Sequence, residues 1–196
     1  PTPTSICAPW RSRALCISSA YAAPACRRWP SCCCTTAAKA LKIPVIKRAA
    51  ALGNIVNSGT VIAIAGTHGK TSTTAMTAEI LDAAELKPTA FVGGHMPGWN
   101  GGLRLGSTDL LVVEADEYDR SFLALRPSVA IVTTMEADHL DIYGSMEGVR
   151  EAYAAFLALV PRDGLIALCS DDEGARSLVR KAPPTVVCYG VDEKHA

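Results

Sequence analysis

The chain has 196 residues, of which 49% are hydrophobic and 19% charged, so we expect one globular domain, or one domain plus a fragment, rather than a disordered chain. Nineteen Lys and Arg balance nineteen Asp and Glu, which excludes an overall field that would attract nucleic acid or an anionic membrane. No apolar run reaches the roughly 18 residues that a membrane span needs, and this predicts a soluble protein.

The first 38 residues differ from the rest of the chain. Residues 1–78 hold no Asp or Glu, and most of the cysteines lie before residue 35. Because residues 1–38 show no helix or strand period, we interpret them as an atypical segment that is disordered or not native, such as an out-of-frame translation joined to a real domain. A secretory leader, a zinc site and a disulfide framework are the alternatives. The lack of a Cys-x-x-Cys pair disfavours zinc, and three adjacent cysteines disfavour disulfides.

From about residue 40 onward, apolar strand patterns alternate with helical ones. Apolar stretches or strands are expected at 43–46, 61–65, 89–92, 110–114, 129–133, 165–169 and 185–189, and helices at 47–56, 71–84, 146–160 and near 172–181. Residues 93–106 form a glycine-rich loop. Such alternation predicts an α/β fold of the P-loop type, with a mainly parallel sheet and helices on both faces.

A glycine loop lies between an expected buried strand and an expected helix. Its sequence, Ala-Gly-Thr-His-Gly-Lys-Thr-Ser over 65–72, has the setting that a phosphate-binding loop requires: glycines let backbone N–H groups approach phosphates, and the helix N-terminus adds positive charge. Lys70 can reach the β- and γ-phosphates, and the Thr71 hydroxyl can ligate Mg²⁺. The pattern G-x-x-x-x-G-K-[ST] is incomplete, because Ile64 stands at its first glycine; an ordinary glycine-rich turn is the alternative.

Four carboxylates gather in the sequence Glu-Ala-Asp-Glu-Tyr-Asp, which begins where the expected strand 110–114 ends. Mg²⁺ prefers oxygen ligands, so Glu114 is a candidate for holding it. If the strand continues, Glu114 and Asp116 point to one face and Glu117 to the other. A solvated acidic turn is the alternative.

A second acidic stretch, Glu-Ala-Asp-His-Leu-Asp over 136–141, follows the expected strand 129–133. His139 within it can act as a metal ligand, as a general base or only as a hydrogen-bonded loop residue. All three motifs follow apolar strands, and open α/β sheets bind ligands at the carboxyl ends of such strands. We therefore expect the three motifs to meet in one site.

Three motifs of the chain resemble those of the Mur ligase family and occur in the family's order. They are GTHGKTSTTAM, NGGLRLG within 93–106, and VVEADEYDRSFLALRPSVAIVTTMEADHLDIYG, and the resemblance covers roughly residues 40–196. The resemblance implies that 39–57 are the tail of an N-terminal UDP-sugar domain with a linker, that 58–196 are an incomplete central ATP-binding domain, and that a C-terminal domain is absent. It also implies that these missing flanking domains are needed for activity, so that the fragment alone is inactive.

The resemblance further implies the cofactors ATP and Mg²⁺ and a set of site residues. These are catalytic Lys70, Glu114 and His139; ATP-binding Gly66, Thr67, His68, Gly69, Lys70, Thr71 and Ser72; metal-binding Thr71, Glu114 and His139; and substrate-contacting Asn100, Arg104, Asp116 and Ser121. Family members of other branches use a carbamoylated lysine shortly after the Asp-His pair. The chain has no lysine between Lys87 and Lys181, as expected for the branch that adds L-alanine.

The implied reaction is ATP-dependent ligation of L-alanine to the carboxylate of UDP-N-acetylmuramate through an acyl phosphate. It takes place in the cytoplasm during synthesis of peptidoglycan precursors, with no nucleic-acid or membrane partner. Three alternatives stay open: a ligase that recycles a tripeptide onto UDP-N-acetylmuramate, a P-loop NTPase switch, and a non-catalytic nucleotide-binding remnant.

Overall fold

The structure, a computed structural model, describes residues 16–18, 45–179 and 185–191 and divides into two compact units, 1–51 and 52–196. In the first unit, β1 (Cys16–Ser18) pairs in parallel with β2 (Val45–Lys47). Helix α2 (Arg48–Val56) follows β2 directly and continues past residue 51 into the second unit. The short strand β1 was not expected from the sequence. The rest of residues 1–38, with the interpretation of that segment and its three alternatives, lies outside the described residues.

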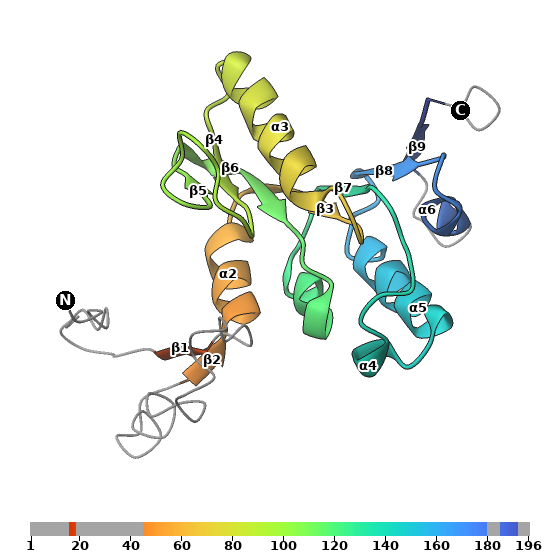
Figure 1. Cartoon of the computed structure of the whole chain (residues 1–196). Coiled ribbons are helices and arrows are strands. Elements are labelled where there is room, and N and C mark those ends of the chain that lie inside the picture. Colours follow the sequence, from red (N-terminus) through yellow and green to blue (C-terminus); the bar gives the residue numbers. More distant parts are fainter. Residues whose placement is uncertain (1–15, 19–44, 180–184, 192–196) are drawn as a thin grey trace. The chain divides into compact units, whose positions relative to one another are not determined.

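The second unit is built on a seven-stranded sheet (Figure 1). Its strands, in chain order, are β3 (Thr60–Ala65), β4 (Pro88–Phe91), β5 (Leu103–Arg104), β6 (Ser107–Glu114), β7 (Val129–Val132), β8 (Leu165–Cys169) and β9 (Val186–Tyr189). They lie in the order β5-β4-β6-β3-β7-β8-β9, and every neighbouring pair is parallel except β4 and β5. The mainly parallel α/β sheet is therefore confirmed.

The helices of the second unit are α3 (Lys70–Ala83), α4 (Leu140–Tyr143), α5 (Met146–Leu157), α6 (Glu173–Ser177) and the 3₁₀ segment η2 (Tyr118–Ala124). Each of the four expected helices has a counterpart, α2 included, but their ends differ from those expected. The expected helices 146–160 and 172–181 are both too long. Each ends in a tighter turn, in which an N–H bonds the carbonyl three residues back: Val160 to Leu157, and Leu178 to Ala175. The segments η2 and α4 were not expected, because neither is long enough to show a helical period.

The central strands are buried on both faces, as their continuous apolar sequences predict. Alternate residues of β3 enter different cores: Val61 and Ala63 join the larger one, whereas Ile62 and Ile64 join the smaller one. The larger core includes α5 and η2, and the smaller includes Ala78 of α3. Helix α3 thus covers one face of the sheet, and α5 with η2 covers the other (Figure 1).

The strand order places the three motifs together. Strand β3 lies between β6 and β7, and all three are parallel, so their carboxyl ends share one edge of the sheet. The glycine loop leaves β3 at this edge, the first acidic stretch leaves β6, and the second follows β7. Among residues 16–18, 45–179 and 185–191, no helix combines the length and apolar character needed to cross a membrane.

Candidate functional site

The loop between β3 and α3 takes a conformation that depends on its glycines. Gly66 has φ +140° and is buried against β7, where an added Cβ would collide with the Thr133 hydroxyl. Gly69 has φ +81° and caps the N-terminus of α3 without a side-chain bond. Both positions strain any residue with a side chain. The loop therefore comes close to the neighbouring strand and turns directly into the helix.

The same loop is fastened to the stretch that follows β7. The N–H of Thr67 donates to the Thr134 carbonyl and the N–H of His68 to the Thr134 hydroxyl, each at 2.9 Å. In return, the Thr133 hydroxyl donates to the His68 carbonyl at 2.5 Å, and the N–H of Glu136 donates to Thr67 Oγ1 at 2.9 Å. These four bonds fix the loop against the stretch that leads to His139.

The positive charge of the site lies at the start of α3. The first backbone N–H groups of a helix have no acceptors within it, so those around Lys70 and Thr71 present partial positive charge. The Lys70 ammonium folds back over the loop and donates to the Gly66 carbonyl at 2.6 Å and to Glu117 Oε1 at 2.8 Å, with a longer contact of 3.4 Å to the Thr67 carbonyl. The structure thus gives Lys70 an acidic partner that the sequence did not predict.

Glu114, the last residue of β6, stands over the start of α3. The Thr71 hydroxyl lies 3.0 Å from both of its carboxylate oxygens, and the N–H of Gly93 donates to Oε2 at 2.6 Å. Thr71 and Glu114, both predicted as metal ligands, therefore lie within hydrogen-bond distance of each other, and Gly93 contacts the same carboxylate. Because β6 ends here, the expected alternation of Glu114, Asp116 and Glu117 between two strand faces does not occur.

Glu117 is the most deeply buried acid of the site. Its side chain is only 5% exposed, and burial raises the pKa of its carboxyl above the ordinary value although the Lys70 ammonium acts to lower it. Oε1 takes the bond from Lys70, whereas Oε2 has no hydrogen-bond partner among the described residues. The Tyr143 hydroxyl donates to the Glu117 backbone carbonyl and so fixes the backbone at this residue. The sequence placed Glu117 in an acidic stretch but did not predict its contact with Lys70.

His139 lies beside Glu117. It caps α4 with a left-handed backbone, φ 52° and ψ 40°, an uncommon conformation for a residue other than glycine. The Tyr118 ring meets its imidazole edge-on, with the ring centres 5.1 Å apart. One ligand atom each of Glu117, Asp138 and His139 lie within 4.8 Å of one another.

Two donor sets therefore suit a divalent cation. The first is the Thr71 hydroxyl with the Glu114 carboxylate, and the second is Glu117, Asp138 and His139. Both offer oxygen atoms, which hard cations prefer, and the buried unpartnered oxygen of Glu117 fits a ligand that this chain does not itself supply.

The residues expected near a substrate are more scattered. Asn100 is exposed in the loop after β4, and the Asp116 carboxylate accepts the N–H of Tyr118 at 3.0 Å. Ser121 is half-buried in η2. Arg104 of β5 forms ion pairs with Glu79 and Asp82 of α3, so its guanidinium fastens the glycine-rich loop to that helix.

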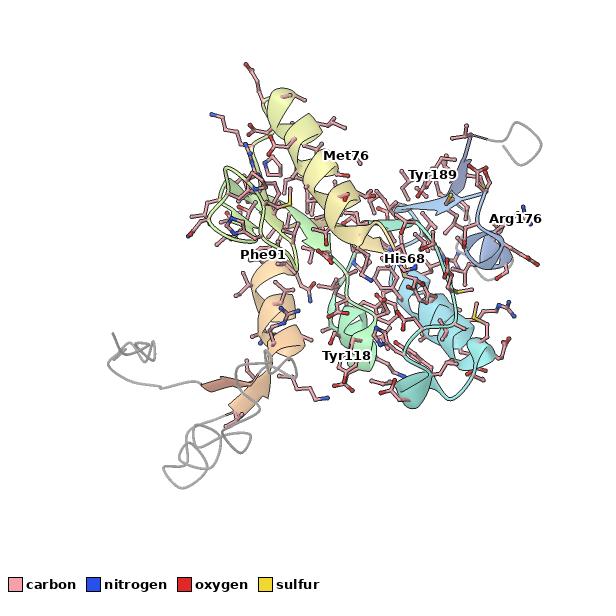
Figure 2. All side chains as sticks on the ribbon, in the orientation of Figure 1. His68, Met76, Phe91, Tyr118, Arg176 and Tyr189 are labelled. Carbon is pink, nitrogen blue, oxygen red and sulfur yellow. The ribbon has the colours of Figure 1, made fainter. Side chains whose placement is uncertain are left out.

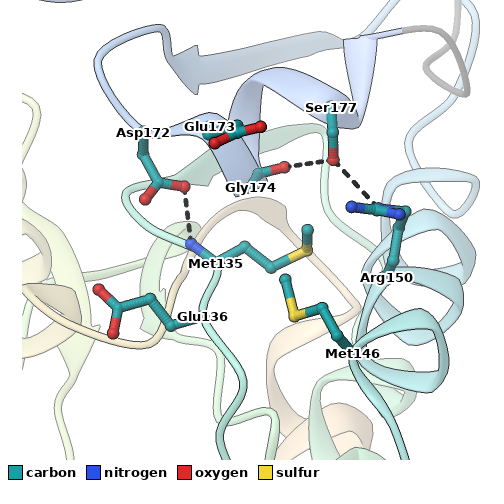
Figure 3. A pocket seen from close by; sticks show the side chains of 8 residues that line it. All are labelled: Met135, Glu136, Met146, Arg150, Asp172, Glu173, Gly174 and Ser177. Carbon is teal, nitrogen blue, oxygen red and sulfur yellow. Dashed lines mark hydrogen bonds between the residues drawn. The ribbon is translucent and has the colours of Figure 1, made fainter.

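A cavity of about 310 Å³ lies beside the second acidic stretch, at the carboxyl ends of β7 and β8 (Figure 3). Met135 and Met146 form its apolar side, and Arg150 and Ser177 lie on its far wall. Asp172 closes one end, where its carboxylate accepts the N–H of Met135 at 2.9 Å and caps α6. None of the residues selected from the sequence lines this cavity.

Figure 2 labels His68 at the tip of the loop and Tyr118 at the start of η2. Their side chains differ in surroundings. His68 is 69% exposed, and its Nε2 lies 3.7 Å from the Glu136 carboxylate, whereas the Tyr118 ring rests against His139. His68 therefore contributes its backbone N–H to the loop and leaves its imidazole in solvent.

With this geometry established, comparison with known proteins identifies the family. A profile described as the Mur ligase middle domain matches residues 64–196. The chain belongs to the Mur ligase family. Two curated relatives, both named UDP-N-acetylmuramate–L-alanine ligase, come from Rubrobacter xylanophilus and Sorangium cellulosum. Each is 47% identical to this chain, over 154 and 156 residues respectively.

Those matches cover 79% and 80% of this chain but 34% and 33% of the relatives, so the chain spans about a third of the length of the curated relatives it matches. Among solved structures, UDP-N-acetylmuramate-alanine ligase MurC from Thermotoga maritima aligns with a TM-score of 0.73 at 27% identity, over 91% of this chain and 39% of that one. A UDP-N-acetylmuramate:L-alanyl-γ-D-glutamyl-meso-diaminopimelate ligase from Neisseria meningitides aligns with a TM-score of 0.69 at 29% identity, over 79% and 53%.

Proposed function

We propose that this chain supplies the nucleotide-binding part of an ATP-dependent ligase that joins L-alanine to the carboxylate of UDP-N-acetylmuramate. The observation that carries the proposal is the meeting of the glycine loop, Glu114 and His139 at the carboxyl ends of three adjacent parallel strands. The curated relatives at 47% identity supply the substrate pair, since both are named as ligases of UDP-N-acetylmuramate and L-alanine.

The loop performs the binding of the phosphates. Residues 66–72 present backbone N–H groups at the start of α3, and Lys70 adds a full positive charge at the same point. Because a triphosphate and a carboxylate repel each other, the reaction needs this charge to bring the two together and to stabilise the charge that develops on the transferred phosphoryl group.

The two donor sets at the strand ends hold Mg²⁺ in this proposal: Thr71 with Glu114, and His139 with its acidic neighbours. Bound Mg²⁺ neutralises phosphate charge and polarises the bond that breaks. Glu114 accepts hydrogen bonds from the Thr71 hydroxyl and from the N–H of Gly93, so it links the start of α3 to the glycine-rich loop. The Tyr118 ring packs edge-on against the His139 imidazole beside this second set.

Binding of the sugar nucleotide and the amino acid involves more than this sheet. We propose that residues 58–196 form a central ATP-binding domain and that residues 39–57 lead into it from a UDP-sugar domain. Asn100, Asp116 and Ser121 are our candidates for contact with the muramate. Arg104 can join them only if it leaves Glu79 and Asp82. The proposed reaction takes place in the cytoplasm.

An exchange of segments tests the proposal. Residues 64–191 replace the matched stretch of the Rubrobacter xylanophilus alanine ligase, and mass spectrometry follows the products made from ATP, Mg²⁺ and UDP-N-acetylmuramate with either L-alanine or the tripeptide. We expect the alanine product, formed about 10²–10³-fold more slowly when the same chimera carries Lys70→Ala.

Three results would contradict the proposal. Tripeptide ligation in preference to alanine would assign the chain to the recycling ligases. ATP hydrolysis that is unaffected by UDP-N-acetylmuramate would indicate a nucleotide switch. A folded chimera that binds no ATP would indicate a remnant without catalytic function.

A further inference from the structure

Lys70 is held by groups of its own chain in the structure. An ammonium group has three N–H donors, and in the described part of the chain Lys70 Nζ donates to three oxygens: the Gly66 carbonyl, the Thr67 carbonyl and Glu117 Oε1. A phosphate oxygen that accepts a hydrogen bond from Lys70 must displace one of these acceptors. Glu117 is the only negatively charged one of the three, and it would stand next to the incoming phosphate as a like charge, so it is the acceptor that repulsion removes.

Glu117 cannot simply be left without its partner. Its side chain is 5% exposed, and its second oxygen already has no hydrogen-bond partner among the described residues. A buried carboxylate that loses its counter-charge is strongly destabilised unless another cation replaces it. Asp138 and His139 can help to bind a cation there, because a ligand atom of each lies within 4.8 Å of a Glu117 oxygen.

From these contacts we propose that Glu117 exchanges partners. While no triphosphate is bound, the Glu117 carboxylate accepts a hydrogen bond from Lys70. When the phosphates bind Lys70 instead, the Glu117 carboxylate binds a divalent cation together with Asp138 and His139. The proposal rests on the proposed nucleotide-binding function and deepens it. By linkage, nucleotide binding and cation binding at the Glu117–Asp138–His139 cluster must then strengthen each other by the same factor.

The exchange predicts opposite effects of one substitution in two measurements. Glu117→Gln keeps the size of the side chain and removes its charge. In EDTA, without divalent cations, the variant should bind ATP about fivefold more tightly than wild type, because Lys70 no longer has to leave a carboxylate. With a non-hydrolysable ATP analogue at saturation, it should bind the second Mn²⁺ about tenfold more weakly, measured by electron paramagnetic resonance.

Two further variants separate the parts of the exchange. Asp138→Asn changes only the cation side, because Asp138 does not contact Lys70; it should weaken Mn²⁺ binding without tightening ATP in EDTA. Asp141→Asn removes an exposed carboxylate two positions beyond His139 and controls for the change in net charge. Circular dichroism and thermal melting establish that each variant is folded.

The outcomes distinguish this proposal from the function it rests on. If wild type binds no ATP, or binds it equally well after Lys70→Ala, the nucleotide site itself is wrong. If wild type binds ATP through Lys70 but Glu117→Gln weakens ATP binding in EDTA, Glu117 only orients the lysine and the exchange is overturned. Unchanged Mn²⁺ binding in Glu117→Gln would also overturn it.

Discussion

Glu114 and Glu117 lie three residues apart but differ in how their charge is stabilised. Glu114 is half-buried at the end of β6, and hydrogen bonds from Thr71 and Gly93 cover both of its oxygens. Glu117 lies in the connection between β6 and η2 and is almost fully buried. One of its carboxylate oxygens accepts a hydrogen bond from Lys70, and the other has no partner among the described residues. The difference suggests that one carboxylate is a fixed support and the other is ready to change partners.

The largest effect is expected from Lys70→Ala, which removes the only ammonium of the loop and the partner of Glu117. In the chimeric ligase, turnover should fall by about 10²–10³, the scale for loss of one preorganised charge-stabilising group. Steady-state kinetics with L-alanine measures it, and Lys87→Ala, on the exposed turn before β4, is the matched lysine control. Turnover near that of the control would contradict the assignment of a phosphate loop.

Glu114→Gln is expected to have the next largest effect. It keeps the shape of the side chain but removes the charge that we assign to Mg²⁺, so the Mg²⁺ concentration for half-maximal activity should rise by at least about tenfold. Glu151→Gln, an exposed acid on α5, is the control. An unchanged Mg²⁺ requirement would make Glu114 a purely structural acceptor for Thr71 and Gly93.

His139→Ala should raise the Mg²⁺ concentration for half-maximal activity less than Glu114→Gln does, because His139 is expected to bind only a second ion. His139 has a left-handed backbone, so Ala also introduces strain, whereas Asn adopts this conformation readily. A Mg²⁺ titration of His139→Ala beside His139→Asn separates the two effects. If only the Ala variant is impaired, the imidazole itself is not needed.

The smallest effect is expected from Tyr143→Phe, which removes the hydroxyl that supports the Glu117 turn. At pH 8 the free energy of unfolding should fall by about 1 kcal/mol, the usual contribution of one such bond. Burial raises the pKa of Tyr143 from 10.0 to about 12, so the folded state retains this proton where the unfolded state loses it.

The stabilisation from the Tyr143 hydroxyl is therefore complete below about pH 10 and is lost as the pH rises toward 12. Chemical denaturation at pH 8 and pH 11 should show the difference between wild type and Tyr143→Phe narrowing. A difference that stays constant over this range would mean that Tyr143 ionises no later in the folded state than in the unfolded one.

Much of the sheet could be predicted, because strands buried on both faces have continuous apolar sequences. Residues 61–65 and 165–169 are clear examples, and their strands lie where expected. Strand β5 has two residues, too few to show a period within a glycine-rich loop. The order of the strands depends on long-range pairing, which local sequence does not encode.

The site was predictable as far as its motifs follow strands, as with Lys70, Thr71, Glu114 and His139. The partners of those residues were not. Glu117 meets Lys70 in the short connection between the end of β6 at Glu114 and the start of η2, and the chain then turns with left-handed backbone at Asp119 and Arg120. A spacing of 47 residues between the two charges gives no sign of that contact.

The bonds from Thr133 and Thr134 to the glycine loop have a consequence for affinity. A flexible loop must lose conformational entropy each time it closes around a ligand, and that loss is subtracted from the binding free energy. Here the tip at Thr67 and His68 is ordered by its own chain before any ligand arrives. The loop tip therefore loses conformational entropy during folding and not again at each binding event. A substitution such as Thr134→Val would leave the tip less ordered before binding, so part of that entropy loss would then reduce the binding free energy.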